Sequence, residues 1–350
     1  MARHAWPDVA RGITVLLVVA MHILFLHSMP LLPDTLAVRG HLPLTSAMTH
    51  LRMPLFFLVS GYLSAAMVQR SWRAGFSGRI APRYYLYVVW LTITALALRT
   101  FAVIDQAPFD TSDYVISQLL EPRGTLWYIW ALALFFLVVR ATRAIPAWML
   151  AIPAAILFIV GQIAFDQPWR DISAGFLPFL LGARLPKEIR ALTDRVPLRI
   201  GVPVLGAGIA LALIDSSLRW PLPVGLAVAA VAVPGVLMVL PHIAQWRILR
   251  PIRHVGRNTL AIFAIHPLLI VLANRIARDQ PMLMEVIGAQ PVLALLWPLA
   301  LLVGIVLVAL ALQRLLRAIG LRHLFEMPRW RALRRAFRLR RATRRARRAQ

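Results

Sequence analysis

The chain alternates long apolar runs with short polar connections that are rich in arginine or in acidic residues. Because about twenty consecutive apolar residues cross a bilayer, runs of this length predict membrane-spanning helices. About ten segments fit, at roughly residues 9–27, 50–68, 84–103, 125–140, 146–164, 171–185, 199–214, 221–240, 257–273 and 291–316. The pattern therefore predicts an all-α polytopic membrane protein, a bundle of about ten transmembrane helices.

Composition agrees with this prediction. The chain has 350 residues, of which 60% are hydrophobic, and its mean hydropathy is +0.71. The first apolar run has a charged start but continues past His22 without a small-residue cleavage site, so we expect a retained helix rather than a signal peptide.

Cysteine is absent, which excludes a disulfide framework, a thiolate metal site and a cysteine nucleophile. We expect no metal.

The net charge of +25 has a regular placement along the chain. Alternate connections are basic, and the connections between them hold most of the acids, which is the positive-inside pattern. The basic connections carry Arg70, Arg73, Arg79 and Arg83, then Arg140 and Arg143, and then the basic residues within 184–199 and 247–257. We therefore place these connections and both termini in the cytoplasm, and we expect no nucleic-acid partner.

The carboxyl end forms a second, smaller region. We assign residues 1–320 to one transmembrane domain and residues 321–350 to an arginine-rich cytoplasmic tail. The spacing of Trp330, Leu333 and Phe337 among arginines predicts a basic amphipathic helix on the anionic cytoplasmic leaflet. A disordered, solvated tail that only fixes topology is the alternative.

Arg11 and His22 lie in the first apolar run, eleven residues apart. On a helix this spacing is about three turns plus roughly 20°, so both side chains share one face about 16 Å apart. Ionisable residues inside membrane segments mark functional sites by default. His22, in apolar surroundings that disfavour its charged form, fits a general base for a hydroxyl group. The alternative is a buried histidine that only bridges two helices.

Five short blocks occur in order along the chain. They are D-x-A-R-G at residues 8–12 with His22, M-P-L-F-F-L-V-S-G at 53–61, R-I-A-P-R-Y at 79–84, L-W-Y-I at 126–129, and G-R-N-T-L at 256–260 with His266. Together they resemble the acyltransferase family 3 membrane proteins, which O-acylate sugars and other hydroxyl acceptors. Arg83 stands where the family shows a second proline. Leu132 stands where some branches carry a glutamate, so no role of that acid transfers to this chain.

The resemblance implies an integral membrane O-acyltransferase of the bacterial inner or plasma membrane. Its donor would be acyl-CoA, expected to be acetyl-CoA, and its acceptor a hydroxyl of a carbohydrate or lipid-linked envelope component, with no tightly bound cofactor. Since guanidinium groups match phosphate geometry, Arg11 and Arg79 are candidates to hold the nucleotide end of the donor. Arg83 is a weaker candidate, for which a topology role is favoured.

Several further residues are candidates to support the site. Ser60 and Gly61 are expected to interrupt the second segment at mid-depth, with Gly61 in helix packing and Ser60 touching the donor or His22. Asp8 lies near the stripe of His22 but too close to the cytoplasmic end to orient the imidazole.

The remaining candidates follow the family blocks. Trp127 and Tyr128 begin the fourth segment on the outer side, where interfacial anchoring explains them at least as well as substrate contact does. Asn258 is a supporting candidate, and His266 is either an auxiliary polar group or a structural bridge.

The main rival function is a secondary transporter or flippase for a polar lipid or sugar. Such proteins commonly use mid-membrane carboxylates and internal repeats. In this sequence the acids cluster at segment ends and neither half repeats the other, which favours the enzyme. A catalytically idle scaffold is the third alternative.

Overall fold

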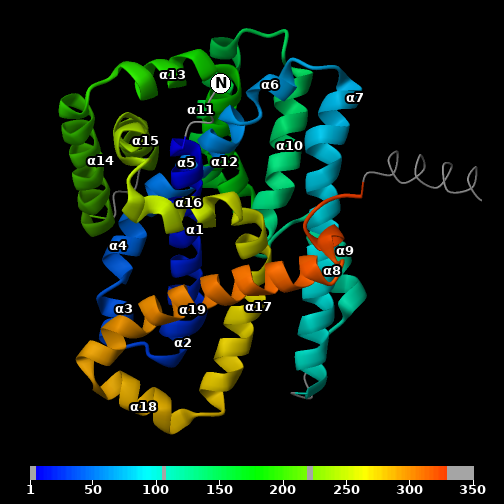
Figure 1. Ribbon diagram of the computed structural model, residues 1–350, viewed down its shortest axis with the longest axis vertical. Helices are drawn as coiled ribbons and strands as arrows, with labels where there is room; N and C mark the ends of the chain where they lie inside the picture. Colours follow the sequence, from blue (N-terminus) through cyan, green and yellow to red (C-terminus); the bar gives the residue numbers. More distant parts are fainter. Residues whose placement is uncertain (1–4, 105–107, 219–223, 329–350) are drawn as a thin grey trace, which may run out of the picture.

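The computed structural model describes residues 5–104, 108–218 and 224–328, and every regular element in these ranges is a helix (Figure 1). In this part of the chain, seven helical spans are long and apolar enough to cross a membrane. They are Trp6–Leu31, Trp72–Ile104, Ala147–Ala164, Leu198–Ser216, Val224–Ile243, Thr259–Arg278 and Pro291–Ala318. The protein is therefore an all-helical, multi-pass membrane protein, as the hydropathy pattern predicts.

Two of these spans contain a π-helical turn. The first span consists of α1 (Trp6–Ile23), the π-helical η1 (Leu24–Ser28) and α2 (Met29–Leu31). The second consists of α7 (Trp72–Gly75), the π-helical η2 (Phe76–Ile80) and α8 (Ala81–Ile104). Single π turns occur frequently at functional sites, and here η1 begins two residues after His22 while η2 contains Arg79.

The other five spans are formed by α11 (Ala147–Ala164), α14 (Leu198–Leu218), α15 (Val224–Ile243), α17 (Thr259–Arg278) and α19 (Pro291–Ala318). Three more of the ten predicted segments fold as shorter helices of 14 to 16 residues: α5 (Thr49–Tyr62), α10 (Trp127–Ala141) and α12 (Trp169–Arg184). Ten crossings and the cytoplasmic location of both termini stay predictions.

The second predicted segment is shorter than expected. Helix α5 ends at Tyr62, and a separate short helix, α6 (Ala65–Val68), follows. Ser60 and Gly61 therefore lie in the last turn of α5, and the predicted interruption of this segment follows directly after them, before α6 begins at Ala65. Its depth in the membrane stays a prediction. The chain turns here because α5 reaches its close contact with α12 and then passes into α6.

The connections between these longer helices, and the stretch after α19, contain the remaining helices. These are α3 (Leu36–Arg39), α4 (Leu42–Ala47), α9 (Thr111–Leu120), α13 (Pro186–Arg195), the 3-10 helix η3 (Arg247–Leu249), α16 (Arg250–Arg257), α18 (Pro281–Ala289) and the 3-10 helix η4 (Arg322–Leu324). Helix α9 begins after Asp110, whose carboxylate accepts hydrogen bonds from the Ser112 hydroxyl and from the Ser112 and Asp113 amides. These bonds hold the pKa of Asp110 below its ordinary value.

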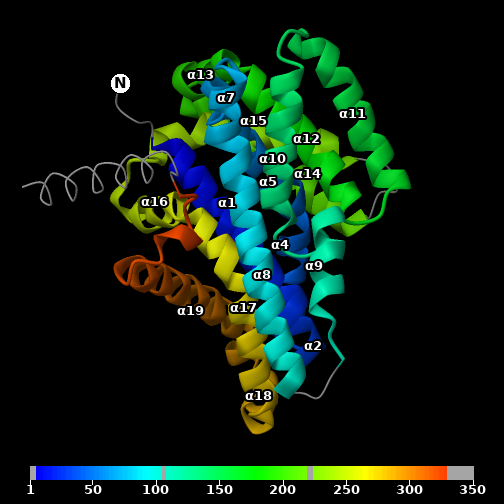
Figure 2. The ribbon, with the colours of Figure 1, turned by 90° about the vertical axis from the view of Figure 1, so that its right-hand side faces the viewer.

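The two ends differ in what they carry (Figures 1 and 2). In both views the amino end of α1, the basic helix α13 and helix α7 lie toward one end, called here the α13 end, while α2 and α18 lie toward the opposite, α18 end. The α13 end is the one that the arginine pattern assigns to the cytoplasm.

Helix α1 lies in the centre and contacts α5, α16, α17 and α19. Three side-chain hydrogen bonds, called here the polar ladder, join its span to α17. They are Arg11 Nη2 to Thr259 Oγ1 (2.5 Å), His22 Nδ1 with His266 Nε2 (3.0 Å), and His27 Nδ1 with Asn274 Oδ1 (2.6 Å). Since the partners advance together along both helices, the ladder fixes their parallel register.

Helix α16 crosses the amino-terminal half of α1 at close range. The carboxylate of Asp8, which is 2% exposed, accepts a hydrogen bond from Arg257 Nε at 2.9 Å. Gly256 lies so close to Asp8 that a Cβ at this glycine would overlap the Asp8 carbonyl. The first and last of the five sequence blocks are therefore in direct contact.

The predicted amphipathic helix around Trp330, Leu333 and Phe337 lies outside the described residues.

Helices α5 and α12 approach closely at two glycines, Gly61 of α5 and Gly182 of α12, each of which lies against the backbone of the other helix. A Cβ at Gly182 would overlap the backbone of Leu58, and a Cβ at Gly61 would overlap the backbone of Phe179. Such small-residue contacts allow close approach of helices in membranes. The predicted packing role of Gly61 is confirmed.

The Gly182 contact gives a stability test. Gly182→Ala should lower the free energy of unfolding by about 1–3 kcal/mol, because the added methyl forces α5 and α12 apart. Gly304→Ala is the matched control in α19, where a Cβ meets nothing within 4 Å, and it should be neutral or stabilising. Thermal unfolding of both variants in detergent measures the difference. Equal midpoints would contradict the close α5–α12 contact.

Candidate functional site

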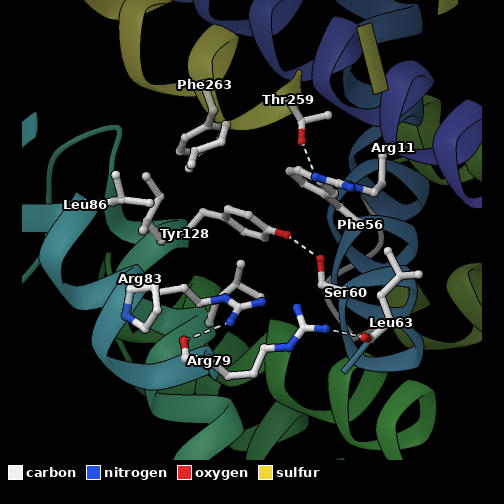
Figure 3. Close-up of a pocket in the computed structure, with 14 residues that line it drawn as sticks. Arg11, Phe56, Ser60, Leu63, Arg79, Arg83, Leu86, Tyr128, Thr259 and Phe263 are labelled. Carbon is white, nitrogen blue, oxygen red and sulfur yellow. Dashed lines mark hydrogen bonds between the residues drawn. The ribbon is translucent and has the colours of Figure 1, made fainter. Parts of the chain in front are cut away.

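A cavity of about 250 Å³ lies between α1, α5, α8, α10 and α17 (Figure 3). Its walls include three arginines, a hydroxyl pair and several apolar side chains. The polar members are Arg11, Ser60, Arg79, Arg83, Tyr128 and Thr259. Four of these, Arg11, Ser60, Arg79 and Arg83, are predicted site residues, and the fold brings them together from three separate sequence blocks.

Each arginine is held at the cavity wall by a hydrogen bond. Arg11 donates to the Thr259 hydroxyl at 2.5 Å, Arg79 donates to the Leu63 carbonyl at 2.6 Å, and Arg83 donates to the Arg79 carbonyl at 2.8 Å. Arg83 lies within electrostatic range of both other guanidinium groups. Three like charges in one mostly apolar cavity repel one another, so the arrangement favours an anionic ligand.

The structure changes the interpretation of Arg83. The sequence favoured a topology role for this arginine, but its side chain lines the cavity beside Arg79. The two residues are four apart, so once η2 continues into α8 they lie on the same helical face. Arg83 therefore joins the anion-binding candidates on geometric grounds.

Ser60 forms its hydrogen bond with Tyr128 rather than with a histidine. The two hydroxyl oxygens are 2.6 Å apart, and both side chains are buried. A serine nucleophile needs a base within hydrogen-bond reach, and the tyrosine hydroxyl does not serve as one at neutral pH. The pair instead links α5 to α10 in the middle of the cavity wall (Figure 3).

The two predicted histidines meet. His266 Nε2 lies 3.0 Å from His22 Nδ1, and His266 Nδ1 lies 3.0 Å from the Ile262 carbonyl oxygen. A carbonyl can only accept, so Nδ1 of His266 carries a proton and, with both rings neutral, its Nε2 accepts from Nδ1–H of His22. This assignment leaves the lone pair of His22 on Nε2.

Exposure distinguishes the two rings. His266 is 0% exposed, whereas His22 is only partly buried. Of the two residues, only His22 has exposed surface, and its Nδ1 faces Nε2 of His266.

An aromatic wall of Phe56, Tyr128 and Phe263 lines one part of the cavity. Phe56 stacks on Tyr128 with ring centroids 4.3 Å apart, and the Tyr128 and Phe263 centroids are 5.2 Å apart. Phe263 in turn contacts His266, with a centroid distance of 5.8 Å. The three arginines line the cavity together with this wall, whereas neither histidine lines it.

Besides the two histidines, three predicted site residues lie outside the cavity lining. Asp8 pairs with Arg257 in the α1–α16 contact. Trp127 packs its ring against Phe57 at 5.8 Å. Asn258 donates to the His254 carbonyl in the turn before α17. The structure gives all three a structural environment, and none of them lines the cavity.

Tyr128, for which the sequence left interfacial anchoring and substrate contact open, is buried and lines the cavity. Sequence reasoning missed two residues that the structure brings to the site. Thr259, next to Asn258, accepts the hydrogen bond of Arg11. Arg52 is 5% exposed and within electrostatic range of His22. An arginine inside an apolar segment was a signal available in the sequence.

Comparison with known families gives a match over most of the chain. A family model described as an acyltransferase domain matches residues 4–314. Comparison with curated proteins and with solved structures gave no match. The match contains all five sequence blocks, so the resemblance seen in them is confirmed.

The Ser60–Tyr128 bond predicts non-additive mutations. Ser60→Ala or Tyr128→Phe alone leaves a buried hydroxyl without a partner and should cost about 1–3 kcal/mol of stability. The double variant should cost less than the sum by about 1 kcal/mol. Unfolding free energies of the cycle measure this coupling. Ser60→Ala with Tyr87→Phe is the control, because Tyr87 bonds the Gln118 carbonyl instead; equal coupling in both cycles would contradict the bond.

Proposed function

Because the chain belongs to the acyltransferase domain family, we propose that it transfers an acyl group, expected to be acetyl, from acyl-CoA to a hydroxyl group of a carbohydrate or lipid-linked acceptor. The family assignment and the apolar helices together make the protein a membrane acyltransferase. They favour this activity over the transporter and the idle scaffold considered from the sequence. We place the enzyme in the cell membrane and its acceptor in the envelope.

The observation that carries the proposal is the arginine cavity with the histidine pair beside its aromatic wall. Phosphate oxygens are the ligands that clustered guanidinium groups bind best. The cavity is smaller than the roughly 300–1,000 Å³ of sites that enclose a whole ligand. We therefore assign it to part of the donor, with phosphates on Arg11, Arg79 and Arg83 and the remaining nucleotide toward the α13 end.

The donor's thioester must then pass the aromatic wall to reach His22. The spacing of Arg11 and His22 along α1 corresponds to about 16 Å of helix. The flexible arm of the coenzyme spans this interval, while Phe56, Tyr128 and Phe263 limit access of water from the cavity. Exclusion of water favours transfer over hydrolysis.

The chemistry at His22 follows from its tautomer. Nε2 takes the proton of the acceptor hydroxyl, and the oxygen attacks the thioester carbonyl carbon to give a tetrahedral intermediate. The intermediate collapses with cleavage of the C–S bond, and the departing thiolate takes the proton from His22. The products are the O-acylated acceptor and free coenzyme A, and His22 returns to its starting state.

His266 acts as a positioning residue in this scheme. Its bond to the Ile262 carbonyl holds its own tautomer, and its Nε2 holds the Nδ1–H of His22. When His22 gains a proton, the same bond becomes charge-assisted and stronger. Asp8, Trp127 and Asn258 support the helices that carry these groups. The arginine-rich tail is assigned to the anionic lipid surface.

Replacement of His22 tests the base. His22→Gln should lower the turnover number by roughly 10²- to 10⁴-fold with little change in donor binding, since the proton acceptor is lost. The assay is transfer of labelled acetyl from acetyl-CoA to envelope material by the purified protein. His27→Gln is the matched control, because His27 is buried on the same span and bonds Asn274 and Trp297. Full turnover by the His22 variant would refute the assignment.

Truncated donors test the arginines. Arg79→Gln should raise KM for acetyl-CoA by roughly 10- to 100-fold, the loss of one or two hydrogen bonds to a charged group, and Arg11→Gln should behave similarly. KM for S-acetyl-pantetheine, which lacks the nucleotide, should not change. Arg123→Gln is the control, because Arg123 pairs with Glu121 outside the cavity. A parallel rise for both donors would mean that Arg79 does not bind the nucleotide end.

A further inference from the structure

Arg52 is a buried cation whose donors the protein does not satisfy. It is 5% exposed, and its Nε and Nη1 have no hydrogen-bond partner. Each buried donor left unsatisfied costs about 1–3 kcal/mol, and more in a charged group. A structure that retains such a group in an apolar interior offers two strong donors to a ligand.

The position of Arg52 relates it to the reaction site. On α5, Arg52 precedes Phe56 by four residues and Ser60 by eight, so the three lie within about 80° on one helical face. Phe56 and Ser60 line the cavity. Arg52 therefore continues this face one turn farther toward the α18 end, and it lies within electrostatic range of His22.

The carboxylate of Asp171 does not accept a hydrogen bond from Nε or Nη1 of Arg52. Asp171, at the start of α12, lies within electrostatic range of Arg52. Its oxygens instead accept from Gln167 Nε2 at 3.1 Å and lie 3.9 Å from Arg170 Nε. Asp171 thus offsets part of the positive charge and leaves Nε and Nη1 of Arg52 available to other acceptor atoms.

The donor does not supply those atoms. Under the proposed function its phosphates lie with Arg11, Arg79 and Arg83 at the cavity, and its thioester is uncharged. The second substrate, in contrast, must bring its hydroxyl to Nε2 of His22. An anionic group on that substrate would lie beside Arg52 when the hydroxyl lies beside His22.

We propose that Arg52 is the anion-recognising residue of the acceptor site, and that the acceptor is an acidic hydroxyl compound bearing a carboxylate or a phosphate. This proposal rests on the proposed function and names its acceptor class. Guanidinium groups bind both kinds of oxyanion, so the two sources are distinguished by experiment.

Three matched probes test the proposal on the full chain in lipid nanodiscs. They are methyl β-glucuronide, methyl β-glucoside 6-phosphate and neutral methyl β-glucoside. For the wild type, kcat/KM of acetyl transfer should be roughly 10- to 100-fold higher for one anionic probe than for the neutral one, as expected for hydrogen bonds to a charged group. Whichever anionic probe is preferred identifies the source as carboxylate or phosphate.

Arg52→Gln should remove this preference, through a higher KM for the anionic probe, and should lower transfer to the neutral probe by a much smaller factor. Arg52→Lys keeps the charge and should retain part of the preference. Arg140→Gln is the matched control. Arg140 is 1% exposed with the same two nitrogens unpartnered, but it lies at the far end of α10 over the Trp72 ring.

Equal loss for charged and neutral probes in Arg52→Gln would overturn the proposal and indicate that Arg52 stabilises the tetrahedral intermediate or the fold. An unchanged preference would also overturn it. Equilibrium binding of the anionic probe without acetyl-CoA gives a readout independent of chemistry. Binding that requires Arg52, in a protein that shows no His22-dependent transfer, would support the anion site while refuting the proposed function.

Discussion

The polar ladder between α1 and α17 is the interaction on which the site depends. In a bilayer interior, polar groups must find partners within the protein because water is absent. The two helices meet this constraint through three side-chain pairs at three depths. The same bonds that satisfy these groups set the register of α1 against α17, and this register brings His22 to His266 and Arg11 to Thr259.

This register also gives Arg11 and His22 different surroundings along one helix. Arg11 lines the cavity, whereas His22 lies eleven residues farther along α1 and does not line it. Helix α5 runs past both residues, so its short length carries Ser60 in the cavity and Arg52 outside its lining. The glycine contact with α12 keeps α5 close enough to serve both. The protein thus keeps partly buried arginines at the cavity and a buried one, Arg52, one helical turn farther along α5.

Much of the fold and part of the site could be predicted before the structure. The apolar runs predicted a helical membrane protein. The blocks around Arg11, Ser60 and Arg79 predicted site residues that share one cavity in the structure. Asp8, Trp127 and Asn258 follow the same blocks but serve packing and turns, because neighbours in sequence diverge on opposite faces of a helix. Tyr128 and Thr259 line the cavity. Each directly follows one of these residues, Trp127 or Asn258, and therefore points in a different direction.

The sequence by itself determined that the protein lies in a lipid bilayer, that it is helical, and which functional groups its single side chains carry. The length of apolar runs, the charge and the functional groups are all local properties of the chain. It predicted a base at His22 and an anion ligand at Arg11 without showing the surroundings of either residue. Only the tertiary structure decided which nitrogen of His22 holds the lone pair, that Arg83 turns into the cavity, and that Arg52 lacks partners. Each of these depends on how the helices pack; the His22 assignment, for example, rests on His266, which lies 244 residues away along the chain.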